Sequence, residues 1–350
     1  MQLEVIQTTR KIHKTSIGWT DFAVGSPFVF RDKATKALIR NACVKCSTGC
    51  TSCYAETIGL RFKTGRAYTK AEMERLECHV DKGVIDSILR FKPRGPYRGG
   101  TTKPKVFLGD CTDLFGEWVP FEALDRVFAA MALRTDVIWQ ILTKRPERMA
   151  AYFKDPELVN VRAAEIAEAT FYEHPKLGGW GTVYNNGDPW PHIWLGASVE
   201  NQATAEARVK HLFKCQAPVL FLSVEPLLSD VDLCHAFGCG CTGLTATDKG
   251  YPQFDFVCGL CDEGEKPPIS WVIVGVESNG PRVGRLPGKS EAKYWDAAAS
   301  IVKQCRDAGV PCFHKQAPAG GLVSHEMDEW PEPMRVREFP EDRRLKATSK

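Results

Sequence analysis

The stretch HIWLGASVE, residues 192–200, shows the pattern that decides the fold: an apolar run rich in strand-forming residues that ends in polar ones. Similar runs recur along the 350-residue chain, at KVFLGD (105–110), VIWQILTKR (137–145), PVLFLSVEP (218–226), WVIVGVES (271–278) and VPCFHKQ (310–316). Segments with helical spacing separate most of them, as with Leu124, Val127 and Phe128 before the second run. Strands that alternate with helices predict right-handed crossovers and a parallel sheet in an α/β fold.

Polar side chains follow each apolar run, and a parallel sheet would bring them together at one edge. The candidates for binding a cofactor at this edge are Asp110, Asp113, Thr143, Lys144, Ser198, Glu200, Asn201, Ser223, Glu225 and Glu277. Each cluster alone also fits a polar loop or a helix N-cap. Six such polar clusters, one after each apolar run, favour a shared site.

A second pattern is NACVKCSTGCTSCYAE, residues 41–56, called here the cysteine loop. It contains Cys43, Cys46, Cys50 and Cys53, and helical spacing begins at Tyr54. Three thiolates can hold three irons of a 4Fe–4S cluster and leave the fourth iron open for a small molecule. Four would instead suit structural zinc or an electron-transfer cluster. A three-cysteine loop that leads into a helix resembles the layout of radical S-adenosylmethionine enzymes.

The resemblance to a known family extends well beyond the cysteines. The matching motifs are GWTD (18–21), STGCTSCYAE (47–56), DLFGEWVP (113–120), QILTKRPERM (140–149), WLGASVEN (194–201), FLSVEPLL (221–228), WVIVGVES (271–278) and AGVPCFHKQ (308–316). They resemble, in this order, a phage- and prophage-associated family with three shared cysteines that is usually described as radical-SAM-like. The resemblance implies a partial parallel β/α barrel and the ligands Cys43, Cys50 and Cys53. The usual radical SAM spacing selects Cys46 in place of Cys43, so the third ligand stays open between them.

The resemblance also implies a function. A 4Fe–4S enzyme of this kind binds S-adenosylmethionine, receives an electron from a donor, and would modify or repair a nucleic acid or nucleotide, as spore photoproduct lyase does. A protein partner encoded nearby is a further expectation. Tyr54 and the polar strand ends would then bind the cofactor: Asp110 or Asp113 its ammonium, Ser198, Glu200 and Asn201 its ribose, and Lys144, Arg145 and Lys315 its carboxylate or a substrate phosphate. The alternative is that these charges pair with one another.

A second cysteine group, residues 231–267, predicts a small zinc-ribbon-like insertion. It offers Cys234, His235, Cys239, Cys241, Cys258 and Cys261, of which four would bind zinc. Cys258 and Cys261 have the spacing of a zinc knuckle.

Two further segments bear on nucleic acid binding. RFKPRGPYRGGTTKPK, residues 90–105, has no acidic residue, and its candidate phosphate contacts are Lys92, Arg94, Arg98, Lys103 and Lys105. A solvated basic loop is the simpler interpretation. The Gly- and Pro-rich residues 171–191 carry Trp180, Tyr184 and Trp190, which would either stack on bases or, more simply, pin the loop to the body of the protein.

Composition sets the broad class. Fourteen cysteines without an export signal predict a cytoplasmic protein whose thiols bind metal or react, and the longest apolar runs are too short to span a membrane. We expect a barrel from 1–230 and 268–320, with 321–350 as a tail. Two other function classes compete: a noncatalytic nucleic-acid-binding protein stapled by zinc or a cluster, and a metal-dependent hydrolase, for which the eight histidines form no ligand pair.

Overall fold

The computed structural model describes residues 3–173, 183, 188–237, 269–277, 291–319 and 322–340. Most of the cysteine-rich segment 231–267 lies outside these residues. None of the helices in the described ranges is long and apolar enough to cross a bilayer.

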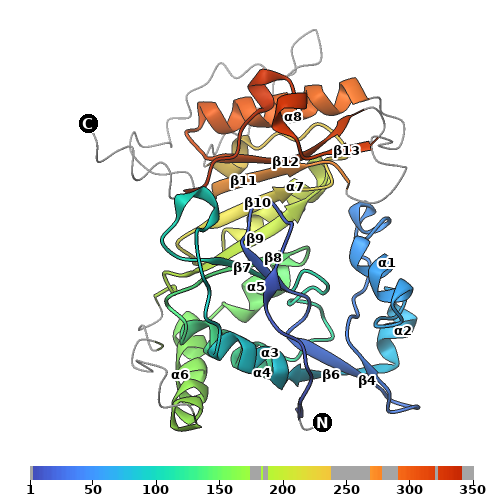
Figure 1. The fold of residues 1–350 in the computed structure, drawn as a ribbon, viewed down its shortest axis with the longest axis vertical. Coiled ribbons are helices and arrows are strands. Elements are labelled where there is room, and N and C mark those ends of the chain that lie inside the picture. Colours follow the sequence, from blue (N-terminus) through green and yellow to red (C-terminus); the bar gives the residue numbers. More distant parts are fainter. Residues whose placement is uncertain are drawn as a thin grey trace.

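A nine-stranded sheet that curls into a half-barrel forms the body of the protein (Figure 1). Its strands, in spatial order, are β13 (Leu322–Ser324), β12 (Cys312–Ala319), β11 (Ile269–Gly275), β10 (Leu220–Val224), β9 (Ile193–Val199), β8 (Ile138–Thr143), β7 (Lys105–Leu108), β3 (Phe22–Val24) and β2 (His13–Lys14). All neighbours from β3 to β12 pair in parallel, whereas β2 and β13 pair antiparallel at the two edges. The six predicted strands are therefore confirmed, and they lie side by side in chain order.

Helices pack against the sheet and against one another. They are α4 (Phe121–Ala132), α5 (Pro146–Tyr152), α6 (Pro156–Glu173), α7 (Gln202–Leu212) and α8 (Glu291–Asp307). Helix α7 packs on β9 and α8 packs on β11 and β12. Because strand side chains alternate between faces, Leu222 and Val272 join the core shared with the helices, while Phe221 and Ile273 point to the other side.

A separate aromatic cluster fills that other side, within the curl of the half-barrel. Trp19 lies 4.8 Å from Phe107 and 6.1 Å from Trp271, measured between ring centroids. Phe313 and Phe339 complete the cluster against Trp271. Both faces of the strands are thus buried, which explains why their sequences are apolar nearly throughout.

A smaller sheet near the N-terminus was not predicted. Its strands, in order, are β1 (Val5–Ile6), β6 (Leu76–Asp81), β4 (Phe28–Asp32) and β5 (Leu38–Ile39), accompanied by α1 (Tyr54–Arg61), α2 (Lys70–Glu74) and α3 (Lys82–Leu89). Two-residue strands such as β1 and β5 are too short to show a period in the sequence. Strand β3, at three residues, escaped prediction for the same reason.

Residues 322–340 are not the tail that we expected. Strand β13 pairs with β12, and Trp330 and Phe339 are 2% and 3% exposed. Trp330 packs on His314, and the Trp271 indole donates a hydrogen bond to the Glu338 carbonyl. The segment was mistaken for a tail because its buried residues are widely spaced among charged ones, so no periodic pattern marks it.

Candidate functional site

A cavity of about 540 Å³ lies where the strands of the half-barrel end, beside the cysteine loop. Its lining includes the predicted residues Cys43, Cys50, Cys53, Tyr54, Asp110, Asp113, Thr143, Lys144, Ser198, Ser223, Glu225 and Glu277. Cys46, Glu200 and Asn201, which the structure also describes, lie outside this lining. The carboxyl ends of the strands therefore converge as predicted, on a space of the size that small-molecule sites occupy.

Three of the four clustered thiols face this cavity. Cys43, Cys50 and Cys53 are half-buried in its wall, whereas Cys46 is exposed. This arrangement favours Cys43 over Cys46 as the third candidate ligand. Among the described residues, no three His, Cys, Asp or Glu side chains converge closely enough to hold a single metal ion. An iron–sulfur cluster differs from a single ion because each sulfur binds a separate iron. The three thiols are of the donor type that a cluster needs, and all three line the same cavity.

The thiols differ in acidity. Burial raises the pKa of Cys43 to about 12 and also raises the pKa of Cys53. A hydrogen bond from the Cys46 thiol, helped by the nearby Lys144 cation, lowers the pKa of Cys50 to about 4. The same hydrogen bond raises the pKa of Cys46. Cys50 is therefore the thiol most readily available as a thiolate.

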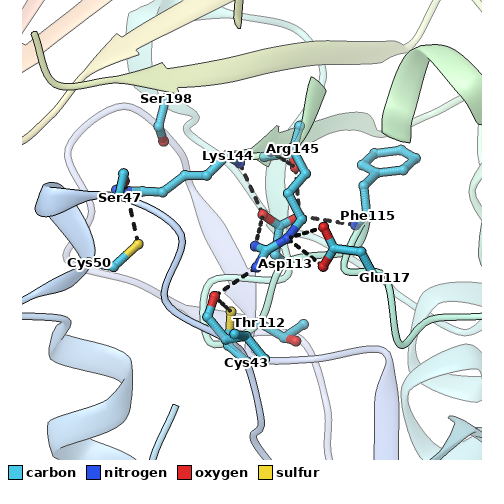
Figure 2. Close-up of polar contacts among 12 residues, drawn as sticks. Cys43, Ser47, Cys50, Thr112, Asp113, Phe115, Glu117, Lys144, Arg145 and Ser198 are labelled. Atoms are coloured by element: carbon cyan, nitrogen blue, oxygen red, sulfur yellow. Dashed lines mark hydrogen bonds and ion pairs between the residues drawn. The ribbon is translucent and has the colours of Figure 1, made fainter. Parts of the chain in front are cut away.

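Asp113 connects the segments that follow β7 and β8, and both of its carboxylate oxygens accept hydrogen bonds from other residues (Figure 2). Its Oδ1 accepts hydrogen bonds from Thr143 Oγ1 at 2.6 Å and from the Phe115 backbone at 3.0 Å. Its Oδ2 accepts from the Lys144 backbone at 3.0 Å and from Arg145 Nη1 at 3.2 Å. With both oxygens engaged, Asp113 and Thr143 support the site, and the expectation that they bind the cofactor is not met by their contacts.

Arg145 connects this support to the cysteine loop. Its Nη2 donates to the Val44 carbonyl at 2.7 Å, and its Nε pairs with Glu117 at 3.0 Å (Figure 2). The guanidinium also lies 4.8 Å from the centre of the Trp118 ring. Burial opposes the charge of Arg145, but the nearby acidic groups, Asp113 first among them, together outweigh it and raise the pKa of Arg145. The motifs around Asp113 and Arg145 thus hold the backbone next to Cys43.

Glu200 holds the other end of the loop. The carboxylate is fully buried and pairs with Lys144 Nζ at 2.5 Å and Arg208 Nη1 at 3.1 Å. Its Oε1 also accepts a hydrogen bond from Ser47 Oγ at 2.8 Å. A Cβ atom at Gly49 would lie 2.5 Å from the Glu200 Cγ atom, so the loop approaches Glu200 closely only because residue 49 is glycine. Burial would raise the pKa of Glu200, but Lys144 and Arg208 lower it.

The predicted ribose contacts of Glu200 and Asn201 are therefore corrected. Asn201 caps α7. Its side chain accepts a hydrogen bond from the Thr204 backbone N–H at 2.9 Å, and the Thr204 side chain accepts one from the Asn201 backbone N–H, which makes a capping box. Glu200 is neutralised by two cations. Both residues shape the structure beside the cavity, as the alternative interpretation of polar strand ends allows.

Glu225, Lys315 and Gln316 form a polar part of the cavity wall at β10 and β12. Lys315 Nζ lies 2.5 Å from Glu225 Oε1, and Gln316 donates to the Val276 carbonyl at 2.7 Å. Ser198 and Ser223 are paired in register on β9 and β10 and are almost fully buried in the same wall.

Asp110 is the lining carboxylate whose Oδ1 is buried and accepts no hydrogen bond from the described residues. Burial raises the pKa of Asp110. Tyr54 donates its hydroxyl to the Asp110 backbone carbonyl at 2.5 Å, which joins α1 to the end of β7. Cys111 and His325 also line the cavity and were not predicted as site residues, because a lone cysteine and a lone histidine give no spacing signal.

The basic segment 90–105 contributes no residue to the lining of the cavity. Lys105 begins β7, so the segment meets the sheet at the amino ends of the strands. Lys105 is fully buried, and its Nζ donates to the Arg98 carbonyl and to Thr101. Arg98 donates to backbone carbonyls, including that of Thr15 at 3.2 Å. Lys105 and Arg98 are thus structural, whereas Lys92 and Arg94 are exposed and Lys103, also exposed, donates to the Thr135 carbonyl.

The other two sequence predictions fall largely on residues that the structure does not describe. Of the zinc candidates, Cys239, Cys241, Cys258 and Cys261 lie outside the described residues, and Cys234 lies in a short 3-10 turn. Trp180 and Tyr184 lie outside as well. Trp190 is buried, donates to the Val183 carbonyl at 2.9 Å and stacks on Phe128, so it pins its loop as predicted.

Comparison with known proteins gives one family. Residues 35–342 match a family described as "Protein of unknown function (DUF5131)". The chain belongs to this family. The matched range includes the cysteine loop and all strands from β7 to β13. Comparisons with curated proteins and with solved structures found no match. Family membership therefore carries no activity, and a functional argument rests on the site itself.

Proposed function

We propose that this protein is a radical S-adenosylmethionine-like enzyme whose 4Fe–4S cluster is held by Cys43, Cys50 and Cys53. The observation that carries the proposal is that these thiols line one cavity together with the polar ends of the parallel strands. Bound there, the cluster would supply the electron that cleaves S-adenosylmethionine to methionine and a 5'-deoxyadenosyl radical. The electron itself would come from an external donor.

The other lining residues supply groups that suit this cofactor. The unpaired Oδ1 of Asp110 suits an ammonium group, and the hydroxyls of Ser198 and Ser223 suit a ribose diol. Trp19 and Phe107 add an aromatic surface on which an adenine ring can rest. These residues take the place of Glu200 and Asn201 in the cofactor assignment.

As substrate we propose a nucleic acid or nucleotide that binds at the end of α1. Ile58 lines the cavity and is 43% exposed. Phe62, one turn further along, is 63% exposed, and the Arg61 guanidinium lies 5.5 Å from the centre of its ring. Exposed aromatic rings stack on bases, and cations pair with phosphates. The α1 end is a better candidate than residues 90–105 because it adjoins the cavity.

The competing classes fit the contacts less well. A metal-dependent hydrolase would need the acidic strand ends as ligands, but Asp113 and Glu200 are engaged by Arg145, Lys144 and Arg208. A zinc-stapled binding module would leave the cavity without a role.

The test is anaerobic purification followed by iron and sulfide analysis, absorption and EPR spectroscopy. We expect iron and sulfide in equal amounts, with Cys43→Ala lowering the iron content more than about tenfold and Cys46→Ala leaving it nearly unchanged. Reduction with dithionite should then release 5'-deoxyadenosine from S-adenosylmethionine. Stoichiometric zinc that resists cluster reconstitution would contradict the proposal and favour the binding module.

A further inference from the structure

Ser47 lies between the Cys50 thiol and the buried carboxylate of Glu200. Its Oγ atom is 3.7 Å from Cys50 Sγ, a contact that Figure 2 shows, and 2.8 Å from Glu200 Oε1. The proposed function gives this hydroxyl no part. We propose that Ser47 is a positioning residue whose hydroxyl donates a hydrogen bond to the Cys50 sulfur once that sulfur binds iron, and thereby makes the cluster easier to reduce.

The backbone of the cysteine loop fixes Ser47 at this place. Ser47 is extended, with φ −154° and ψ 171°, and it precedes the 3-10 turn Thr48–Cys50. The Cys50 N–H donates to the Ser47 carbonyl at 3.0 Å, which closes the turn between the two residues. The Ser47 side chain accepts no capping hydrogen bond from the turn, so its hydroxyl is left to side-chain partners.

The Ser47 hydroxyl has one proton and two neighbours that can accept it. Glu200 has other donors, because its Oε1 pairs with Lys144 Nζ at 2.5 Å and its Oε2 with Arg208 Nη1 at 3.1 Å. In the metal-free protein either Ser47 or Cys50 can donate across the 3.7 Å contact. A sulfur bound to iron keeps no proton, so the hydroxyl is then the donor. Glu200 retains both cations when the hydroxyl turns to the sulfur.

The consequence for the site rests on the proposed function. A ligating sulfur carries part of the negative charge of a cluster, and reduction adds one electron to that charge. A hydrogen bond to the sulfur offsets part of the charge and therefore favours the reduced form. No proton is transferred, since Ser47 keeps its hydrogen atom and the electron comes from the external donor. Ser47 thus sets how readily the site accepts the electron with which the proposed reaction starts.

The experiment compares Ser47→Thr with Ser47→Val, two side chains of nearly the same shape that differ in the hydroxyl. Both are β-branched and suit the extended backbone at this position. Full-length protein is reconstituted anaerobically with iron and sulfide, and EPR and absorbance give the ratio of reduced to oxidised cluster in a redox titration. We expect Ser47→Val to lower this ratio about threefold or more at a given potential, and Ser47→Thr to stay near the wild type. Thr48→Val removes an exposed hydroxyl from the same turn and should leave the ratio unchanged.

Because the ratio is taken per cluster, a looser loop that loses iron faster does not change it. Equal ratios in Ser47→Thr and Ser47→Val would overturn the inference. So would a Ser47→Val protein that binds no cluster while Ser47→Thr does, since the hydroxyl would then hold the loop in place and not offset charge. A wild-type protein that takes up no iron and sulfide contradicts the proposed function and this inference with it. A loaded wild-type cluster with equal ratios in the two variants contradicts this inference alone.

Discussion

At the scale of single residues, Glu200 shows how a strand-end carboxylate acquires its role. It joins three elements: Ser47 of the cysteine loop, Lys144 after β8 and Arg208 on α7. Removing one charge of a buried group leaves its partners uncompensated in a low-dielectric interior. Loss of the Glu200 charge should therefore destabilise the folded protein and release the cysteine loop at Ser47.

We predict that Glu200→Gln lowers the free energy of unfolding by about 3 kcal/mol, because Lys144 and Arg208 lose their counter-charge. The cysteine loop should also loosen, so reconstituted iron should be lost several times faster. Urea titration and the decay of cluster absorbance measure the two effects. The matched control is Glu206→Gln on α7, an exposed residue whose substitution should change the free energy of unfolding by less than about 0.5 kcal/mol. Equal effects of the two substitutions would refute the role assigned to Glu200.

At the scale of elements, α1 is the helix that connects the cysteine loop to the surface. Its N-cap is Cys53, Ile58 lies at the cavity, and the exposed Arg61 and Phe62 lie at its end. A polymer bound at this end of α1 would have its reactive group within reach of the cavity. None of residues 90–105 lines the cavity, and Arg98 reaches the cavity wall only through the backbone carbonyls of Thr15 and Ile17, which do line it.

We predict that a suitable DNA or RNA raises the rate of 5'-deoxyadenosine formation, and that the double variant Arg61→Ala, Phe62→Ala reduces this stimulation about tenfold or more, since base stacking alone contributes ~1–3 kcal/mol. The basal rate without polymer serves as the internal reference. The variant Lys92→Ala, Arg94→Ala removes two exposed cations from the other end of the sheet and should keep the stimulation. Loss in the second variant and not in the first would return the substrate to residues 90–105.

At the scale of the whole molecule, buried histidines couple folding to pH. Burial lowers the pKa of His79, and it lowers the pKa values of His314 and His192 further. His314 on β12 interacts with the Tyr294 hydroxyl at 2.8 Å and the Met334 carbonyl at 3.1 Å, and thereby joins α8 to the C-terminal segment. His192, just before β9, interacts with the Met131 carbonyl at 3.1 Å. Burial lowers the pKa of His314 and of His192 to about 4, from an ordinary value of 6.5.

The sign of the pH dependence follows from these values. Between pH 6.5 and 4 the unfolded chain binds protons at both positions and the folded protein does not, so stability falls as the pH falls. Each histidine contributes a loss of up to roughly 3 kcal/mol across this window. We predict that urea midpoints decrease from pH 7 to pH 5, and that His314→Gln flattens the decrease. The exposed His13 provides the control, and a His13→Gln variant with the same flattening would contradict the assignment.

Local patterns in the sequence were sufficient to predict the α/β class, the six central strands and their convergence on one site. The reason is physical: a strand buried on both faces must be apolar along its whole length, and its polar end must lie at the edge of the sheet. The same patterns could not reveal strands of two or three residues, such as β1 and β3, or the packed residues 322–340.

Only the tertiary structure decided what each polar residue does. The Ser47–Glu200 hydrogen bond joins positions 153 residues apart, so no local spacing distinguishes Glu200, which is neutralised, from Asp110, whose Oδ1 is unpaired. In the sequence, the family resemblance selects Cys43 and the usual radical SAM spacing selects Cys46. In the structure, Cys43 lines the cavity and Cys46 is exposed. The sequence therefore determined which residues reach the site, and packing between distant segments decided which of their groups remain available for chemistry.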